Sequence, residues 1–454
     1  MKCKIWKTLR DRMLSTPFCT LSEEQGSLSF EETVIYVEAF AARLSLPCYG
    51  ILCHSEMAAS LALLSCFAAG VTAVPLSLRY GEEHCRSIIK KMKIPALITD
   101  GNGILKIERT EYLYQAPSEG PALILSTSGT TGHPKGIMLS EDNILSNLLD
   151  IADYFKIGHG DSILIARPLY HGAVLTGEFL ISLFKGVNIV FYSAAFSPAA
   201  WLSEIRNRRI TVLGGTPTVL TMLARFAHNE KLPLRHIVVS GECLHARQAK
   251  KLRQAFFDAD IYSVYGLSEA SPRVSYLPPS CFDTQAGSVG IPLRSVEMCI
   301  VDENGYPVEE NTEGELIIKG PNVMLGYFDD PALTERTVRN GWLYTGDCAY
   351  RAKGGFYYIC GRTDDMIIRA GMNIYPAQIE NALLEDERVE DVLVYGYDAQ
   401  DVRGIGLKVK GSFQDIAEVY SLCVRVLPDW ELPTHIEIVK EISRNATGKK
   451  RRKE

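Results

Sequence analysis

Residues 123–136 read LILSTSGTTGHPKG, a short apolar run followed at once by hydroxyl-bearing residues, glycines and one lysine. The run LIL is typical of a buried strand, and the glycines that follow indicate a loop. A loop of this composition offers backbone N–H groups, hydroxyl groups and a lysine charge to phosphate oxygens. The segment therefore predicts an anion-binding loop at the end of a strand.

This loop does not have the spacing of a P-loop. A P-loop has four residues between its glycines and then Gly-Lys-Ser or Gly-Lys-Thr. Here Gly129 and Gly132 are followed by Pro134-Lys135-Gly136. The spacing therefore argues against a P-loop kinase or ATPase, while composition alone leaves open a solvated Ser/Gly turn.

Outward from the loop, short β-branched runs alternate with helical patterns as far as about residue 270. Including 123–126, the runs lie at 162–166, 188–192, 210–215, 236–240 and 261–266, and the helical patterns at 142–154, 174–184, 198–208, 217–228 and 246–257. Such alternation indicates βαβ crossovers and a mostly parallel, doubly wound α/β sheet. Ligands bind at the carboxyl ends of the strands of such sheets.

Two further regions follow this α/β part. Short strands and turns, with an Asn304-Gly305 turn, predict a β-rich subdomain at about 285–360. From residue 361 onward the pattern is mixed: we expect helices at 376–384 and 415–426 and strands at 392–396 and 435–439. We therefore expect an N-terminal domain at 1–363 and a small α+β C-terminal domain at 364–454, with the boundary at Asp364.

The composition is that of an ordinary globular protein. The 454 residues include 48 Lys+Arg and 54 Asp+Glu, a net charge of −6, and 46% of them are hydrophobic. An acidic balance disfavours nucleic acid as the main partner. The 12 cysteines include no CxxC pair, which predicts free thiols, argues against a disulfide framework or a zinc site, and favours a reducing, cytoplasmic location.

Neither apolar segment near the N-terminus predicts a membrane anchor or a secretory signal. Residues 1–14 alternate basic and apolar side chains, which indicates an amphipathic first helix. Residues 57–76 are uncharged but rich in small side chains, and Gly70 divides them. We expect a buried helix followed by a strand rather than a membrane span.

The loop at 126–136 is one of ten blocks that, in this order, resemble the adenylate-forming superfamily. That superfamily includes acyl-CoA synthetases, nonribosomal adenylation domains and luciferases. The motifs of this chain are most similar to those of acyl-CoA ligases. The blocks are LSFEE (28–32), FAAGVTAVPL (67–76), STSGTTGHPKG (126–136), RPLYH (167–171), SGECL (240–244), VYGLSEAS (264–271), GELIIKGPNVMLGYF (314–328), GWLYTGD (341–347), GRTDDMIIRAGMNIYPAQIE (361–380) and NATGKK (445–450). Together they cover nearly the whole chain.

The resemblance implies an ATP site. The phosphate loop would hold the β and γ phosphates with Ser128, Gly129, Thr130, Thr131, Gly132 and Lys135. The adenine would lie between Tyr265-Gly266 on one side and Gly241 and Glu242 on the other.

The remaining roles at this site also follow from the resemblance. Glu269 would bind Mg²⁺, which suits a carboxylate. Ser268, where the family more often has Thr, would meet the α-phosphate and the acyl carboxylate. Asp347 would accept hydrogen bonds from the ribose hydroxyls with help from Arg362, and Lys449 would reach the attacking carboxylate. The basic residues 450–453 fit a solvated tail.

The implied acyl pocket has a histidine gate and mostly small walls. His171 would gate the carboxylate end, and the expected lining is Tyr170, Gly172, Gly215, Thr216, Gly266 and Ser271. Amino-acid-activating relatives have an aspartate near position 172, so glycine there disfavours an α-amino acid. Glu178 could pair with a substrate amine or hydroxyl, but a solvated helix surface or a subdomain contact is the favoured interpretation.

The resemblance implies that a hinge at Asp364 turns the C-terminal domain between two poses. The expected function is ATP-dependent ligation of a carboxylic acid to a thiol, through an acyl-adenylate and pyrophosphate, with CoA as acceptor. The alternative is a stand-alone adenylation enzyme that loads an aryl, hydroxy or unusual amino acid onto a separate phosphopantetheine carrier protein. A binding or regulatory protein with a degenerate site is disfavoured, because Lys135, Glu269 and Asp347 are present.

Substitution of Lys449 by alanine tests its assigned role. A cation placed at developing charge is typically worth about 3–4 kcal/mol, so Lys449→Ala should slow adenylation by roughly two to three orders of magnitude. Transfer of the acyl group from preformed adenylate to thiol should be spared. Single-turnover assays of the two half-reactions measure this, and equal loss in both would contradict a role in adenylation alone.

Overall fold

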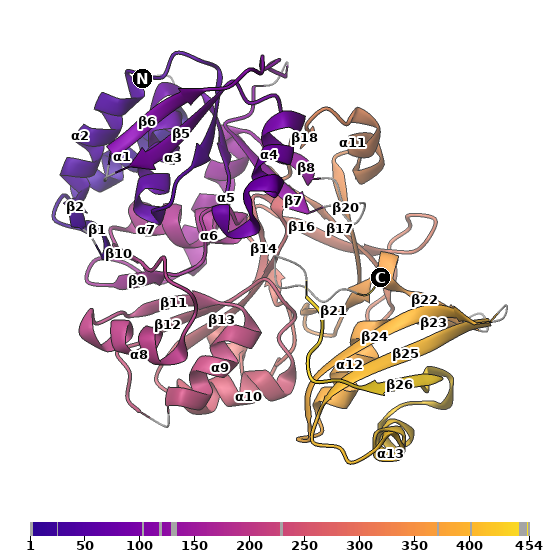
Figure 1. Cartoon of the computed structure of the whole chain (residues 1–454). Helices are drawn as coiled ribbons and strands as arrows, with labels where there is room; N and C mark the ends of the chain where they lie inside the picture. The colour runs from indigo at the N-terminus through magenta and orange to yellow at the C-terminus, as the bar shows by residue number, and fades with distance from the viewer. Residues whose placement is uncertain are drawn as a thin grey trace. The chain divides into compact units, whose positions relative to one another are not determined.

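The computed structural model describes residues 3–24, 26–101, 104–117, 120–128, 134–227, 230–369, 372–399, 402–444 and 452 (Figure 1). The chain forms two compact units. The first comprises residues 1–244, 248–298 and 318–343, and the second comprises 245–247, 299–317 and 344–454. The domain boundary predicted at Asp364 is the point about which the C-terminal domain would rotate. It stays a prediction.

The first unit contains a nine-stranded sheet that confirms the predicted parallel core. Its spatial order is β15 (Ile291–Pro292), β14 (Arg273–Leu277), β13 (Asp260–Gly266), β12 (His236–Val239), β11 (Val212–Gly215), β9 (Ser162–Ile165), β10 (Asn188–Phe191), β1 (Thr20–Glu23) and β2 (Gly26–Ser29). Neighbouring strands from β13 through β1 are parallel. Their carboxyl ends therefore meet at one edge of the sheet.

The predicted helices of this region are present, with one irregularity. The regular helices are α5 (Glu141–Tyr154), α8 (Pro198–Asn207), α9 (Pro217–Ala227) and α10 (Ala246–Ala255). The helix expected at 174–184 is instead α6 (Gly172–Val174), a π-helical turn η2 (Leu175–Leu180) and α7 (Ile181–Lys185). All six residues of η2 are buried. Turns of this kind are rare in proteins and often lie at functional sites.

A second sheet, of seven strands, contains the run at 123–126. Its order is β18 (Gly326–Tyr327), β8 (Pro134–Leu139), β7 (Leu123–Ser128), β4 (Thr72–Pro75), β3 (Cys48–Leu52), β5 (Ala96–Gly101) and β6 (Ile104–Arg109). The sequence pattern groups this run with the later strands, and that grouping is wrong. Strand β7 pairs antiparallel with β8, with Ser128 opposite Pro134, so the chain returns as a hairpin and not through a helix.

The N-terminal helices pack against one another. Helices α1 (Lys4–Ser15), α2 (Phe30–Ala41) and α3 (Glu56–Ala69) are in mutual contact, and α1 also contacts α5 and α7. Helix α1 buries Ile5, Trp6, Leu9 and Met13, which confirms its amphipathic pattern. Helix α3 ends at Gly70, whose φ of 69° suits glycine, and β4 follows, as predicted. Within the described residues, no helix has the length and apolar character needed to cross a bilayer.

Short strands follow residue 290, as expected for a β-rich segment. A five-stranded sheet has the order β16 (Glu297–Val301), β17 (Gly314–Lys319), β20 (Trp342–Arg351) and β19 (Val338–Arg339), and β21 (Tyr357–Arg362) pairs with β20. The predicted Asn304-Gly305 turn closes on Asp302, whose carboxylate accepts from the backbone N–H groups of Asn304 and Tyr306.

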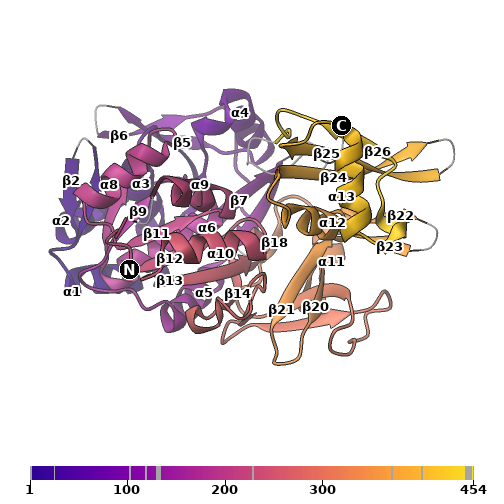
Figure 2. The same ribbon diagram turned by 90° about the horizontal axis from the view of Figure 1, so that it is seen from below.

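The second unit contains the predicted mixture of helices and strands. Strands β24 (Val389–Ala399), β25 (Val402–Gly411) and β26 (His435–Ile438) form one sheet, and β22 (Ile367–Arg369) pairs with β23 (Met372–Ile374). Helices α12 (Pro376–Leu384) and α13 (Ile416–Val426) pack side by side against β24 and β26 (Figure 2). Their apolar faces and the strands share one core that includes Ile379, Val392, Leu407, Val419 and Leu422.

All 12 cysteines are free thiols, and eight of them are buried. Burial raises the pKa of the Cys66 thiol well above its usual value, so this thiol stays protonated.

The absence of CxxC pairs argues against a zinc site, yet Glu313, Cys348 and Cys360 place ligand atoms within 4.8 Å of one another. Sequence spacing does not reveal this group, because strand pairing brings its members together.

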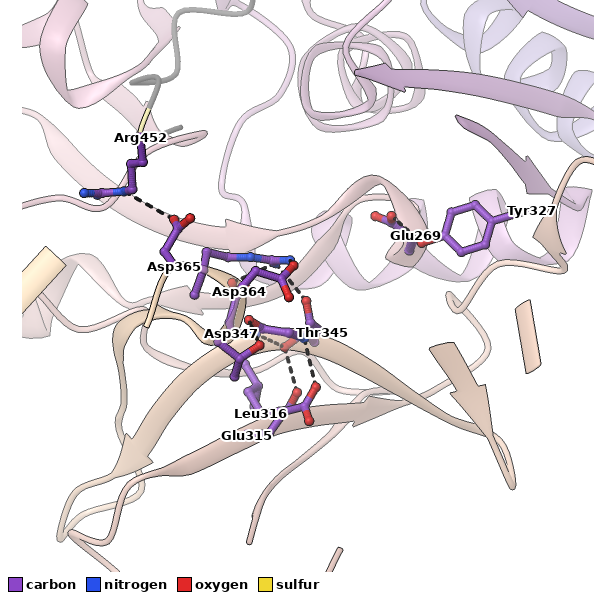
Figure 3. Close-up of polar contacts among 12 residues, drawn as sticks. Glu269, Glu315, Leu316, Tyr327, Thr345, Asp347, Asp364, Asp365 and Arg452 are labelled. Atoms are coloured by element: carbon purple, nitrogen blue, oxygen red, sulfur yellow. Dashed lines mark hydrogen bonds and ion pairs between the residues drawn. The ribbon is translucent and has the colours of Figure 1, made fainter. Parts of the chain in front are cut away.

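Arg452 is not part of a solvated tail, contrary to the interpretation of residues 450–453. Its guanidinium donates to Glu380 of α12 (Nη2 to Oε2, 3.1 Å) and to the Val394 carbonyl (2.7 Å). It also lies 3.3 Å from the Asp365 carboxylate (Figure 3). Glu380 is only 5% exposed, so a buried carboxylate determines where this arginine binds.

The Glu380–Arg452 pair should contribute measurably to stability. Arg452→Ala leaves the Glu380 carboxylate with fewer donors in a buried place, which should cost about 2 kcal/mol of unfolding free energy and lower the melting temperature. Arg425→Ala is a matched control, because Arg425 is 64% exposed and its partner Asp386 keeps Arg388. That control should change stability by less than about 1 kcal/mol. Equal melting temperatures for the two variants would contradict the anchoring role.

Candidate functional site

Two side chains of the first unit, Glu269 and Lys135, meet at Tyr327 of β18. The Tyr327 hydroxyl donates to Glu269 Oε1 at 2.9 Å (Figure 3). The Lys135 ammonium group lies 5.6 Å from the centroid of the same ring. The structure therefore brings together the lysine of the predicted phosphate loop and the predicted Mg²⁺ ligand, 134 positions apart in the sequence (269 − 135).

Glu269 lies in a single helical turn, η3 (Ser268–Ala270), directly after β13. Its backbone carbonyl accepts from the N–H of Met324 at 2.9 Å. The segment that contains Met324 and Tyr327 therefore holds both the backbone and the side chain of Glu269. Glu269 is partly exposed, and its Oε1 is held by the Tyr327 hydroxyl. A carboxylate fixed in this way is a suitable ligand for Mg²⁺, so the residues present fit this ion.

Strand β13 ends in the predicted adenine-binding residues. Tyr265 is partly exposed, and Gly266 pairs with Arg273 of the neighbouring β14. A Cβ at Gly266 would overlap the carbonyl of Pro272, so only glycine allows the two strands to approach this closely. The glycine of this motif therefore sets the position of the turn that contains Ser268 and Glu269.

Gly241 and Glu242 follow β12 at the same edge of the sheet. Gly241 has a φ of 92°, a conformation that favours glycine. The Glu242 carboxylate accepts from the Thr218 hydroxyl at 2.7 Å, which fixes its direction at the start of α9. The orientation of Glu242 is thus set by a residue that sequence reasoning did not single out.

Several predicted site residues lie outside the described residues. These are Gly129, Thr130, Thr131, Gly132 and Lys449, and for Ser128 only the backbone is described. Their roles remain predictions.

The second unit contains Asp347 and Arg362 on the paired strands β20 and β21. They are opposite one another in the register, and Arg362 Nη1 donates to Asp347 Oδ1 at 3.0 Å and to the Thr345 carbonyl at 2.8 Å. Asp347 and Thr345 are labelled in Figure 3. Gly346, between Thr345 and Asp347, has a φ of 69°, and its N–H donates to Glu315 Oε1 at 3.0 Å. The structure brings together the two residues predicted to bind ribose.

Asp364, the predicted hinge residue, lies two positions after the end of β21. Its side chain is 66% exposed, and one carboxylate oxygen lies 3.8 Å from Arg362 Nη2. The hydroxyl of the preceding Thr363 donates to the Gly346 carbonyl at 3.0 Å, so the segment leading into Asp364 is tied to the turn beside Asp347. Rotation about Asp364 stays a prediction.

The predicted gate, His171, belongs to an aromatic cluster of the first unit. His171 Nε2 lies 2.6 Å from the Tyr80 hydroxyl, and the rings of Tyr80 and Tyr170 both meet His171 edge-on. Burial raises the pKa of Tyr80 to about 12, so its hydroxyl keeps its proton at neutral pH. Tyr80, which sequence reasoning missed, therefore orients the imidazole.

The small residues predicted to line an acyl pocket have close neighbours within the protein. A Cβ at Gly172 would lie 2.9 Å from Leu125, and one at Gly215 would lie 2.8 Å from Leu220. The Ser271 hydroxyl is fully buried and donates to the Asn322 carbonyl at 2.8 Å. Thr216 accepts from the Val219 N–H at 3.4 Å at the start of α9. Packing therefore accounts for the glycines, and their place in a pocket stays a prediction.

Glu178 is 1% exposed and lies inside η2, so the solvated-surface interpretation is wrong. Its carboxylate accepts a hydrogen bond from Arg167, which follows β9. The signal that could have found this pair is an arginine eleven residues before an acid (178 − 167), with no Lys, Arg, Asp or Glu between them. Burying one charge requires the other.

Comparison with known proteins agrees with this geometry. Residues 110–328 match the family model described as AMP-binding enzyme. The chain is 30% identical to a feruloyl-CoA synthase of Amycolatopsis over 85% of this chain and 84% of that protein. It is 28% identical to the 2-succinylbenzoate–CoA ligase of Bacillus subtilis over 94% of each chain.

Solved structures are similar along the whole chain. The o-succinylbenzoate coenzyme A synthetase of Bacillus subtilis, solved with ATP and a magnesium ion, has a TM-score of 0.86. The two chains are 26% identical, and the match covers 98% of each.

Asp347→Asn should weaken ATP binding while leaving the fold intact. The amide keeps the shape of the side chain but loses the charge that strengthens hydrogen bonds from ribose hydroxyls, so the KM for ATP should rise roughly 10- to 100-fold. Pyrophosphate exchange at varied ATP concentration measures this. Asp283→Asn is the control, because Asp283 is 63% exposed and forms an ion pair with Arg253. An unchanged KM in Asp347→Asn would remove this residue from the nucleotide site.

Proposed function

The chain belongs to the AMP-binding enzyme family, and we propose that it activates a carboxylic acid with ATP and passes the acyl group to CoA. Two of its relatives are named a feruloyl-CoA synthase and a 2-succinylbenzoate–CoA ligase. The observation that carries the proposal is the meeting of Lys135 and Glu269 around Tyr327. A lysine beside a fixed carboxylate that follows the parallel strand β13 suits a magnesium nucleotide.

In the first half-reaction, a carboxylate oxygen of the acid attacks the α-phosphorus of ATP. The bond from that phosphorus to the bridging oxygen of the β-phosphate breaks, and pyrophosphate leaves with the electron pair. We assign Lys135 to the charge of the departing phosphates, and Glu269 to Mg²⁺, which would neutralise phosphate charge when bound. Ser268, one position before Glu269, is assigned to the α-phosphate and the acid.

In the second half-reaction, the CoA thiolate attacks the acyl carbon, and AMP leaves. His171, oriented by Tyr80, is assigned to the carboxylate end of the acid, where an imidazole can exclude water from the mixed anhydride. Asp347 and Arg362 are assigned to the ribose. Lys449 is assigned to the adenylation pose and Asp364 to the hinge, both on the resemblance alone.

The acceptor distinguishes this proposal from its alternative. A carrier protein with a phosphopantetheine arm presents the same thiol chemistry as CoA. The relatives described above are named for the formation of CoA thioesters, which favours CoA as the acceptor in this protein. The location of the protein in the cytoplasm and the choice of acid stay proposals of the same kind.

The products of the reaction test the proposed function. Incubation with ATP, Mg²⁺ and a panel of fatty, aryl, hydroxy and dicarboxylic acids should release pyrophosphate and AMP rather than phosphate and ADP. With CoA present, at least one acid should yield acyl-CoA at the rate at which its adenylate forms. Omission of Mg²⁺ is the control and should abolish exchange. Adenylate formation without transfer to CoA, but with transfer to a carrier protein, would support the alternative.

A further inference from the structure

Three charged side chains of the first unit are buried together. They are Arg167 after β9, Glu178 in the π-helical turn η2 and Arg273 at the start of β14. Glu178 and Arg273 are 1% and 2% exposed, and the Arg167 side chain is 18% exposed. All three belong to the first unit. Buried charges of this kind are rare and need partners.

Each of the three charged residues lies within a few positions, along the chain, of a residue that we assign to the acyl pocket. Arg167 precedes Tyr170 and His171 in the loop after β9. Glu178 is in η2, which follows α6 and therefore Gly172, and Arg273 follows Ser271-Pro272.

Two glycines make room for the charged groups. A Cβ at Gly214, next to Gly215 in β11, would overlap Glu178 Oε1. A Cβ at Gly177 would lie 2.5 Å from Arg273 Nη2. Both close approaches depend on a missing side chain, so the backbone of β11 and of η2 is shaped around the cluster.

The cluster is not electrically balanced. Two guanidinium groups and one carboxylate leave one positive charge. Arg167 donates to Glu178 and to the Ser240 hydroxyl, at 3.2 Å from Nη2. Asn147 binds both the N–H and the carbonyl of Arg273, at 3.1 and 2.7 Å, so the backbone there is satisfied.

Polar atoms in the cluster nevertheless lack partners. Arg167 Nε, Glu178 Oε2 and Arg273 Nε are buried and have no hydrogen-bond partner among the described residues. Burial lowers the pKa of the Arg273 guanidinium, because the charged form loses its hydration there. A buried donor without a partner costs about 1–3 kcal/mol, more when it is charged. If the cluster served stability alone, leaving the Arg167 and Arg273 Nε donors unpaired would only cost stability.

We propose that the Arg167–Glu178–Arg273 cluster is a subsite for a second anionic group on the acyl substrate, so that the preferred acids are dicarboxylates. One carboxylate would be activated near Ser268 and His171, and the other would accept hydrogen bonds from the two arginines. Glu178 would orient the Arg167 guanidinium and offset the repulsion between the two arginines. This inference rests on the proposed function, because it names the substrate class of that site.

The test compares each dicarboxylic acid with its own monomethyl ester. The ester keeps the length and shape of the acid but removes one negative charge. Across a series of chain lengths, ATP–pyrophosphate exchange gives kcat and KM for both members of each pair. For wild-type protein, we expect at least one diacid to exceed its ester roughly 10- to 100-fold in kcat/KM, mainly through KM.

Two variants should shift this selectivity in opposite directions. Arg167→Gln removes a donor and a positive charge, so the preference for the diacid should fall roughly 10-fold or more, and Arg167→Lys should restore part of it. Glu178→Gln removes the competing carboxylate, so the preference for the diacid should rise. A merely structural role would make both variants lower activity toward acid and ester alike.

Arg206→Gln is the matched control, because it breaks the exposed Arg206–Glu230 pair of the same unit and should leave the ratio unchanged. Wild-type kcat/KM values that are equal for every acid and its ester would overturn this inference while leaving the proposed function intact. The same holds if Arg167→Gln does not change the ratio in folded protein, as judged by its melting temperature. If no acid supports exchange, the proposed function fails, and this inference falls with it.

Discussion

Parallel pairing from β13 to β1 is the constraint on which the first unit depends. Parallel strands in register end together, so the segments that follow β9, β11, β12 and β13 are gathered at one edge. His171 follows β9, Gly241 and Glu242 follow β12, and Glu269 follows β13. Each of these side chains is then fixed by a residue from elsewhere in the unit, such as Tyr80, Thr218 or Tyr327. The sheet supplies location, and the long-range hydrogen bonds supply direction.

Much of the architecture could be predicted from local patterns. The alternation of β-branched runs with helical periods predicts strands β9 to β13 and their helices, because both periodicities are local properties of the chain. Strand partners are not local. The run at 123–126 has the same composition as the later strands, yet it pairs with β8 in another sheet. The π-helical turn η2 likewise has no sequence signal separate from that of an ordinary apolar helix.

The site could be predicted as a set of residues but not as a set of contacts. Motifs identify Lys135, Glu269, Asp347 and Arg362, and the structure brings them together as two groups, each within its own unit. Tyr327 was missed as a participant, because a tyrosine in an apolar block reads as core. Glu178 and Arg452 were misread for the opposite reason: charged residues are expected in water, and only the fold shows that each has a buried partner.

The charged cluster and its two glycines also limit how this sequence can change over time. A larger residue at position 214 would clash with Glu178, and a larger residue at position 177 would clash with Arg273. Replacing Glu178 by a small apolar side chain would leave Arg167 and Arg273 without a carboxylate between them, and position 214 would no longer need glycine to make room for that carboxylate. Substitutions at these five positions are therefore energetically coupled and should not be additive. Among descendants of this chain, the five residues should be kept or lost together, as one inherited character.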